Sequence, residues 1–145
     1  ELLPALSPTA EPARDAAFSG EWEPVWTDEK EINFLRARGL FGRPWTRTFQ
    51  QIDVARGTLR NVLEFGGGGG GGALVVGATI ARADTADGAR LGFAFSACEL
   101  RVGALTVPLP PVGRGWGELL YLDDELRVQR DVRGDVIIAR KVGAA

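Results

Sequence analysis

Apolar and polar residues alternate with a period of two over most of the chain beyond residue 45. Six runs show this pattern: 46–54, 58–65, 73–81, 89–102, 117–131 and 136–142. Such alternation is typical of strands that bury one face. Gly57 and Gly134 lie in short segments between runs and suit tight hairpin turns. The pattern predicts a mainly all-β antiparallel protein of about eight or nine short strands, arranged as a barrel or a sandwich.

The N-terminal part of the chain departs from this pattern at first. Residues 1–19 contain three prolines and are expected to form an extended lead-in. Residues 20–27, "GEWEPVWT", predict a strand in which Trp22, Pro24 and Trp26 share one face. Because proline cannot donate to a sheet ladder, we expect Pro24 at an edge or a bulge.

One short helix is predicted near residues 28–38. Asp28 is a plausible N-cap, acidic residues crowd the first turn, and Gly39 is placed to end the helix. Much further along, residues 105–117 hold three prolines and three glycines, so we expect a long loop there.

Seven consecutive glycines, Gly66–Gly72, separate two of the predicted strands. A phosphate-binding loop requires a lysine directly after the glycines and a following helix, but the next lysine beyond the tract is Lys141. We therefore interpret the tract as a hairpin loop: a flexible insertion or, alternatively, a flap over a ligand site.

The composition excludes several classes of function. The chain of 145 residues has a formal net charge of −2, and this provides no basic field for nucleic acid. It has no histidine and a single cysteine, Cys98, so we expect no histidine-based catalysis and no multi-cysteine metal site. Alternation places Cys98 opposite Phe93 and Phe95, as a small packing residue. The acidic triplet 123–125 is expected to be solvated, and no metal site is predicted.

Four stretches together resemble the plastid lipid-associated protein (fibrillin) family. They are "GEWEPVWTDEKEINFL" (20–35), "TFQQIDVARGTLRNVLEF" (48–65), "LPPVGRGWGELLYLDDELRVQRDVRGD" (109–135) and the closing "VIIARKV". The resemblance implies one lipocalin-like barrel domain over residues 20–145, in a plastid (chloroplast) protein associated with plastoglobules or thylakoids. It carries over no catalytic residues, so it implies a protein that is not an enzyme.

The resemblance also implies a ligand and a structural pair. Family members are taken to bind or organise carotenoids, quinones, tocopherols or acyl lipids, and no other cofactor is expected. Gly20-x-Trp22 is similar to the lipocalin G-x-W motif, in which an arginine of the last strand packs over the tryptophan. Arg140 is the candidate for that closure with Trp22, and Arg130 is the alternate.

Our leading hypothesis is a non-enzymatic barrel that holds a hydrophobic ligand, since a barrel of about eight strands encloses one small molecule. The residues predicted to line its pocket are Trp22, Trp26, Phe93, Phe95 and Tyr121. Tyr121 is included because its hydroxyl would orient the polar end of a ligand.

Two alternatives from other classes remain open. The first is a structural or adaptor protein with a self-filled barrel that docks on a thylakoid complex, a membrane or a lipid droplet, with Trp116 as a contact. The second is an isomerase-like or lipid-modifying enzyme, which requires Glu99 or Asp53 to point into the barrel. A cavity, a filled interior or a buried carboxylate distinguishes the three.

Overall fold

A computed structural model describes residues 2–40, 42–67, 71–82 and 85–144. Nine strands make up most of it: β1 (Gly20–Thr27), β2 (Trp45–Asp53), β3 (Thr58–Phe65), β4 (Gly72–Arg82), β5 (Arg90–Val102), β6 (Leu105–Leu109), β7 (Arg114–Leu122), β8 (Leu126–Asp131) and β9 (Val136–Gly143). The helical segments are α1 (Leu3–Leu6), the 3₁₀ turn η1 (Ala16–Phe18) and α2 (Lys30–Arg38).

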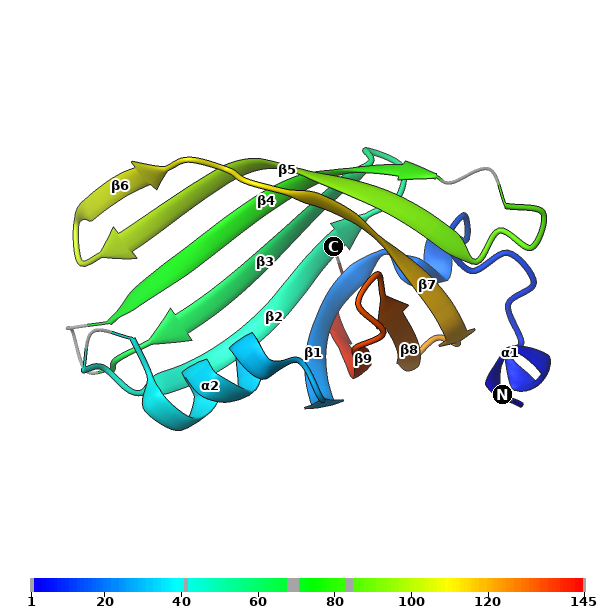
Figure 1. The fold of residues 1–145 in the computed structure, drawn as a ribbon, viewed down its shortest axis with the longest axis horizontal. Coiled ribbons are helices and arrows are strands. Elements are labelled where there is room, and N and C mark those ends of the chain that lie inside the picture. Colours follow the sequence, from blue (N-terminus) through cyan, green and yellow to red (C-terminus); the bar gives the residue numbers. More distant parts are fainter. Residues whose placement is uncertain (1, 41, 68–70, 83–84, 145) are drawn as a thin grey trace.

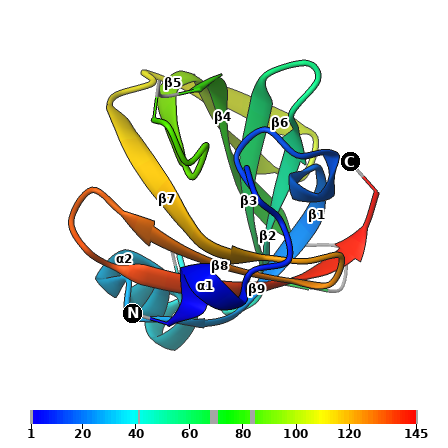
Figure 2. The same ribbon diagram turned by 90° about the vertical axis from the view of Figure 1, so that its right-hand side faces the viewer.

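Eight of the strands form a closed ring. The hydrogen-bonded order β4-β3-β2-β1-β9-β8-β7-β5 is completed by pairing of β4 with β5, and every pair is antiparallel. Figure 2 shows these strands curving around a common interior, with β6 attached to β5 as a ninth strand. The predicted all-β, barrel-like class with one short helix near residues 28–38 is confirmed.

The helix α2 begins two residues later than its predicted N-cap. Its N-cap residue is Glu29, whereas the Asp28 carboxylate accepts a hydrogen bond from the backbone N–H of Val136, 2.6 Å away. Asp28 therefore joins the start of α2 to β9 instead of capping the helix. Gly39 ends the helix as predicted, with φ of 68° and its N–H donating to the carbonyl of Leu35.

The N-terminal segment crosses one end of the ring, toward the right in Figure 1, and helps to close it. The backbone N–H of Ala13 donates to the carbonyl of Gly88 at 2.9 Å, and the Thr9 hydroxyl donates to the carbonyl of Leu122 at 2.8 Å. Phe18 is buried in the core. The segment is less extended than its prolines predict, because it contains α1 and η1.

Residues 105–109 correct the prediction of a long loop, because they form the strand β6. The long strand β5 has two partners: its first part, Arg90–Ala94, pairs with β7, and its last part, from Cys98, pairs with β6. All five residues of β6 are exposed. The prolines made this segment look like a loop in the sequence. An edge strand tolerates proline, however, because one side of its backbone has no partner to bond.

The strand pairings of the described residues contain five register shifts, and three of them bear on the candidate residues. These three place an extra residue between Pro24 and Trp26 in β1, between Phe95 and Ala97 in β5, and between Leu119 and Tyr121 in β7. A shift of one residue turns the side chains that follow to the other face of the sheet. Pro24 thus lies beside a bulge, as predicted.

The glycine tract connects two neighbouring strands, and β3 pairs with β4 along the whole length of β3. Phe65 at the end of β3 pairs with Gly72 at the start of β4, so the hairpin prediction is confirmed by the described flanks. Of the tract, Gly68–Gly70 lie outside the described residues. At Gly72 a side chain would overlap the carbonyl oxygen of Arg101, so this position requires glycine.

We expect deletion of Gly68–Gly70 to change stability by less than about 1 kcal/mol, because the cost of loop closure depends only weakly on loop length. The measurement is the midpoint of urea unfolding. Substitution Gly72→Val is the contrasting change and is expected to destabilise clearly. Equal effects of the two changes would show that stability depends on the length of the tract.

Candidate functional site

A partly open cavity of about 300 Å³ lies inside the ring, and we call it the first cavity. Its apolar wall comes from β3 and β5, through Leu59, Leu91, Phe93 and Phe95. Its polar lining consists of Glu29, Gln50, Asn61, Arg114, Gln129, Asp131 and Arg133. A cavity of this size, lined by both apolar and polar side chains, is within the range of small-molecule sites.

A second cavity of about 210 Å³ adjoins the first and is more apolar. Its apolar lining consists of Pro24, Ile32, Leu63, Val76, Phe95 and Ile137. Glu29, Gln50, Asn61 and Phe95 line both cavities, so the two spaces meet at these four residues. Three polar side chains therefore lie at the junction, and the other polar residues of the first cavity lie away from the second.

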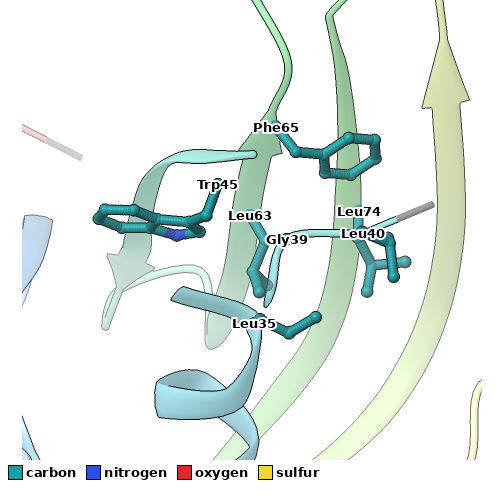
Figure 3. Close-up of a pocket in the computed structure, with 7 residues that line it drawn as sticks. All are labelled: Leu35, Gly39, Leu40, Trp45, Leu63, Phe65 and Leu74. Atoms are coloured by element: carbon teal, nitrogen blue, oxygen red, sulfur yellow. The ribbon is translucent and has the colours of Figure 1, made fainter. Parts of the chain in front are cut away.

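The helix α2 seals the second cavity on one side. Figure 3 shows Leu35 of the helix and Leu40 facing Leu63, Phe65 and Leu74 of the sheet. The space left among them is only about 10 Å³. At the other side of the helix, the guanidinium of Arg36 donates to the carbonyl of Pro24 at 3.1 Å. These contacts hold α2 against the part of the ring where β1 and β2 no longer pair.

Arg127 of β8 organises the polar residues beneath the first cavity. It is fully buried, and its Nη1 donates to Oε1 of Gln129 at 3.0 Å while its Nη2 donates to Oε1 of Gln50. Gln50 in turn donates through Nε2 to Oδ1 of Asn61 at 2.6 Å. We call Gln129, Arg127, Gln50 and Asn61 the polar series. It joins β8, β2 and β3 across the interior of the ring.

The charge of Arg127 is not neutralised by direct pairing. Among the described residues no carboxylate forms an ion pair with it, and its Nε has no hydrogen-bond partner. Burial lowers the pKa of Arg127 to about 9, and attraction to Glu29 opposes that shift. The guanidinium therefore stays protonated at neutral pH, deep in the protein.

The cations that cover Trp22 are Arg127 and Lys141, which corrects the pairing with Arg140. The Arg127 guanidinium lies 5.2 Å and the Lys141 ammonium 4.9 Å from the Trp22 ring centre. Arg140 points outward, 63% exposed, with its guanidinium 3.6 Å from Glu23. The alternate, Arg130, forms an ion pair with Glu118 at 3.3 Å. On β8 and β9 the residues with odd numbers point inward, whereas the sequence prediction had chosen the even-numbered Arg130 and Arg140.

Glu29 places a carboxyl group in the lining of both cavities. Its side chain does not cap α2. Burial, together with repulsion from the nearby carboxylates of Asp131, Asp135 and Glu31, raises the pKa of Glu29 to about 7, while Arg133 acts in the opposite direction. Near neutral pH the cavity therefore holds a carboxyl group that is partly protonated.

This shift predicts a pH dependence of stability. Because the pKa of Glu29 is about 7 in the folded protein and 4.5 ordinarily, the folded state binds more protons between these values. Stability is therefore expected to fall as pH rises from about 4.5 to about 7. Carboxylates with lowered pKa values, such as Glu31 and Asp123, lose their contribution only at lower pH.

The check is urea unfolding of the wild-type protein and of Glu29→Gln at pH 5 and pH 8. We expect the wild type to lose stability between these values and the variant to lose less. An identical pH dependence of the two proteins would contradict the assignment to Glu29.

Phe93 and Phe95 lie in the cavity wall, as the strand pattern predicted. Their ring centres are 5.5 Å apart. Two glycines around the start of β7 make room for these rings. A Cβ at Gly115 would lie 3.0 Å from the Phe93 ring, and one at Gly113 would lie 3.2 Å from the Phe95 ring. Whether the two rings contact a ligand remains a prediction. Trp22 is buried at the closed end of the interior, outside the lining of both cavities.

Two other predicted lining residues face outward. Trp26 is 50% exposed because the bulge after Pro24 turns it to the face of Ile138. Tyr121 follows the bulge in β7, which places Leu122 inside instead, and its hydroxyl donates to the Asp123 carboxylate at 2.7 Å. The structure thus corrects the placement of Trp26 and Tyr121 in the pocket.

The remaining candidates of the sequence also lie outside the cavities. Trp116 is only partly exposed, since the Arg90 guanidinium covers its ring at 4.0 Å. Glu99 pairs with Arg101 on the outer surface, and Asp53 accepts a hydrogen bond from the backbone of Arg56. In the described ranges no group of three or more acidic, cysteine or histidine residues is placed to hold a metal.

Cys98 is on the opposite face from the one predicted. It pairs with Val76, which lines the second cavity, because the extra residue at Ser96 in β5 shifts the register of β5 against β4. Cys98 and Phe95 therefore share the inner face of β5.

Reasoning from sequence missed Glu29 and the polar series. Glu29 was interpreted as one of several acids favoured near a helix start. Residues 127, 129 and 131 alternate as polar positions in β8, and such a face is ordinarily assigned to solvent. The available signal was that the other face of β8 carries only Leu126, Val128 and Arg130, so β8 has no wholly apolar face to turn inward.

Comparison with known proteins gives two matches. The family model described as PAP_fibrillin matches residues 1–140. The chain is also similar to "Probable plastid-lipid-associated protein 11, chloroplastic" of Arabidopsis thaliana, with 39% identity over 125 residues, covering 86% of this chain and 56% of the relative. The chain thus spans little more than half the length of that relative. No solved structure matches the chain.

Proposed function

Because the chain belongs to the PAP_fibrillin family, as the sequence motifs indicated, we propose that it is a non-enzymatic plastid protein that holds a hydrophobic small molecule inside its ring of strands. The relative's name, a plastid-lipid-associated protein of the chloroplast, supports both the compartment and the lipid association. The proposed site of action is the plastoglobule or the thylakoid. None of the helices in the described ranges has the length and apolar character needed to cross a membrane.

The observation that carries this proposal is the interior space. Cavities of about 300 Å³ and about 210 Å³ meet at Asn61 and Phe95. Together they lie within the volumes typical of small-molecule sites, and the wall of the second cavity is mostly apolar. A structural barrel filled by its own side chains would leave no such space.

The first test is mass spectrometry of an organic extract of the native protein. We expect a carotenoid, quinone, tocopherol or acyl lipid in stoichiometric amount. The second test is fluorescence titration of the purified protein with N-phenyl-1-naphthylamine, a neutral apolar probe. Failure of both to show a ligand would contradict the proposal.

Two matched variants locate the binding. Val76→Phe adds volume to the wall of the second cavity, whereas Thr79→Phe adds the same ring to an exposed position of β4. We expect Val76→Phe to weaken binding of N-phenyl-1-naphthylamine and Thr79→Phe to leave it unchanged. Equal effects would place the probe outside the cavities.

An adaptor or structural role is the second candidate, and it is favoured by the exposed apolar side chains of β6 and the residues after it. Leu105 is 63% exposed and Val112 is 80% exposed. We expect substitution of both by aspartate to reduce co-sedimentation with isolated thylakoid membranes without changing probe binding. Unchanged co-sedimentation would count against this surface as a contact.

A further inference from the structure

The hydrogen-bonding direction of the polar series is determined by Arg127. A guanidinium group has N–H donors and no acceptor, so each group bonded to it must present an oxygen. Gln129 and Gln50 both do so, through their Oε1 atoms. Their amide NH₂ groups therefore point away from Arg127.

The second step in the series uses the oxygen of Asn61. Because Gln50 donates through Nε2 to Oδ1 of Asn61, the free end of Asn61 is its Nδ2 group. The free end of Gln129 is its Nε2 group for the same reason. Both residues line the first cavity, neither nitrogen donates to another described residue, and neither is fully buried. Each end of the series thus offers N–H donors to the cavity.

A close contact with the backbone supports this arrangement at Gln129. A Cβ atom at Gly117 would overlap the Gln129 Nε2 atom, so the missing side chain of Gly117 leaves room for the amide. Gly117 is itself buried. The position of the amide is therefore set from two sides, by Arg127 and by the strand β7.

We propose that the cavity selects neutral lipids whose polar end is a carbonyl oxygen, as in a ketone, an ester or a quinone, with Asn61 and Gln129 donating to that oxygen. This inference rests on the proposed function and specifies the ligand of the same site. A hydrocarbon offers no acceptor and would leave these donors unpaired once water is displaced.

The charges in the lining favour a neutral carbonyl compound over a carboxylate. Glu29 and Asp131 line the first cavity and would repel an anionic head when ionised. Of the two arginines in the same lining, Arg114 and Arg133, the second is already paired with acidic residues. The positive charge of Arg127 is screened from the cavity by Gln50 and Gln129, which occupy its Nη atoms. The apolar tail has Leu91 and Phe93 on one side of the junction and the second cavity on the other.

The experiment measures displacement of N-phenyl-1-naphthylamine from the wild-type protein at pH 8. The competitors share one chain length: 2-tridecanone, tridecane and tridecanoate. We expect the ketone to compete roughly 3- to 10-fold more tightly than the hydrocarbon, the range expected for one or two hydrogen bonds. We expect tridecanoate to be weaker than the ketone.

Two nearly isosteric variants then test the donors directly. Asn61→Asp keeps an acceptor for Gln50 but replaces the NH₂ group by an oxygen, and Gln129→Glu does the same while giving Arg127 a carboxylate partner. We expect both to reduce the advantage of the ketone, while Gln129→Glu leaves the melting temperature unchanged or raises it. Gln51→Glu, on the outer face of β2, adds the same charge as a control and is expected to keep the advantage.

The outcomes separate the two levels of the proposal. If the probe binds but ketone and hydrocarbon compete equally, or tridecanoate competes best, the carbonyl assignment is wrong and the proposed function stands. Absence of probe binding to the wild type would overturn both. The wild-type comparison requires no variant, so a variant that fails to fold does not remove the test.

Discussion

Replacement of Trp22 by alanine is expected to destabilise the protein by about 3–5 kcal/mol, the cost typical of removing a buried tryptophan. Trp22 is fully buried, and its indole N–H donates to the carbonyl of Phe18 at 3.0 Å. Arg127 and Lys141 lie over its ring. The substitution therefore leaves a cavity, removes the hydrogen bond to the carbonyl of Phe18 and removes the aromatic ring beneath two cations.

The measurement is the free energy of unfolding in urea, which is about 5–15 kcal/mol for proteins in general. Trp22→Phe is the second variant. It retains an aromatic ring and loses the hydrogen bond to Phe18, so we expect an intermediate loss.

Trp26→Ala on the same strand is the matched control. Trp26 is 50% exposed, and we expect a change within about 1 kcal/mol. A loss from Trp26→Ala as large as that from Trp22→Ala would contradict the bulge that turns Trp26 outward.

Replacement of Arg127 by alanine is the second large expected effect, a loss of about 2–4 kcal/mol. The change leaves the amide oxygens of Gln50 and Gln129 without their donor, and an unsatisfied buried acceptor costs about 1–3 kcal/mol. Relief of an unpaired buried charge opposes this loss and limits its size. Thermal and urea unfolding both measure it.

Two comparisons show whether the geometry of the guanidinium matters. Arg127→Lys keeps the charge, but an ammonium group does not reproduce the planar fork that reaches both glutamines, so we expect a clear loss here too. Arg140→Ala removes an exposed arginine of β9 and is expected to cost less than about 1 kcal/mol. A larger loss from Arg140→Ala than from Arg127→Ala would restore the pairing first inferred from sequence.

Most of the fold could be predicted from sequence, because strand formation here depends on local alternation and turn residues. Residues 20–27 and 58–65 form strands at the predicted bounds. The strand β6 was missed because Pro108 and the following prolines resemble a loop. Closure of the ring by β4 and β5 is a long-range pairing that no local pattern determines.

The candidate site was predicted less well, for a physical reason that concerns register. Phe93 and Phe95 precede the bulge region of β5, so alternation placed them correctly. Trp26 and Tyr121 come after bulges, and one inserted residue reverses the face of everything beyond it. Arg127 was missed because a charged residue is ordinarily exposed, whereas here two glutamines and an aromatic ring allow its burial.

The strand β6 has a hydrogen-bonded neighbour on one side only among the described strands, and this bears on self-association. An unpaired edge with exposed apolar side chains such as Leu105 and Val107 is a template on which a second chain can add a strand. Proline fits such a strand only where its nitrogen faces away from the partner, so Pro108 removes a donor from the open edge. The prolines that made β6 look like a loop in the sequence thus also oppose edge-to-edge aggregation.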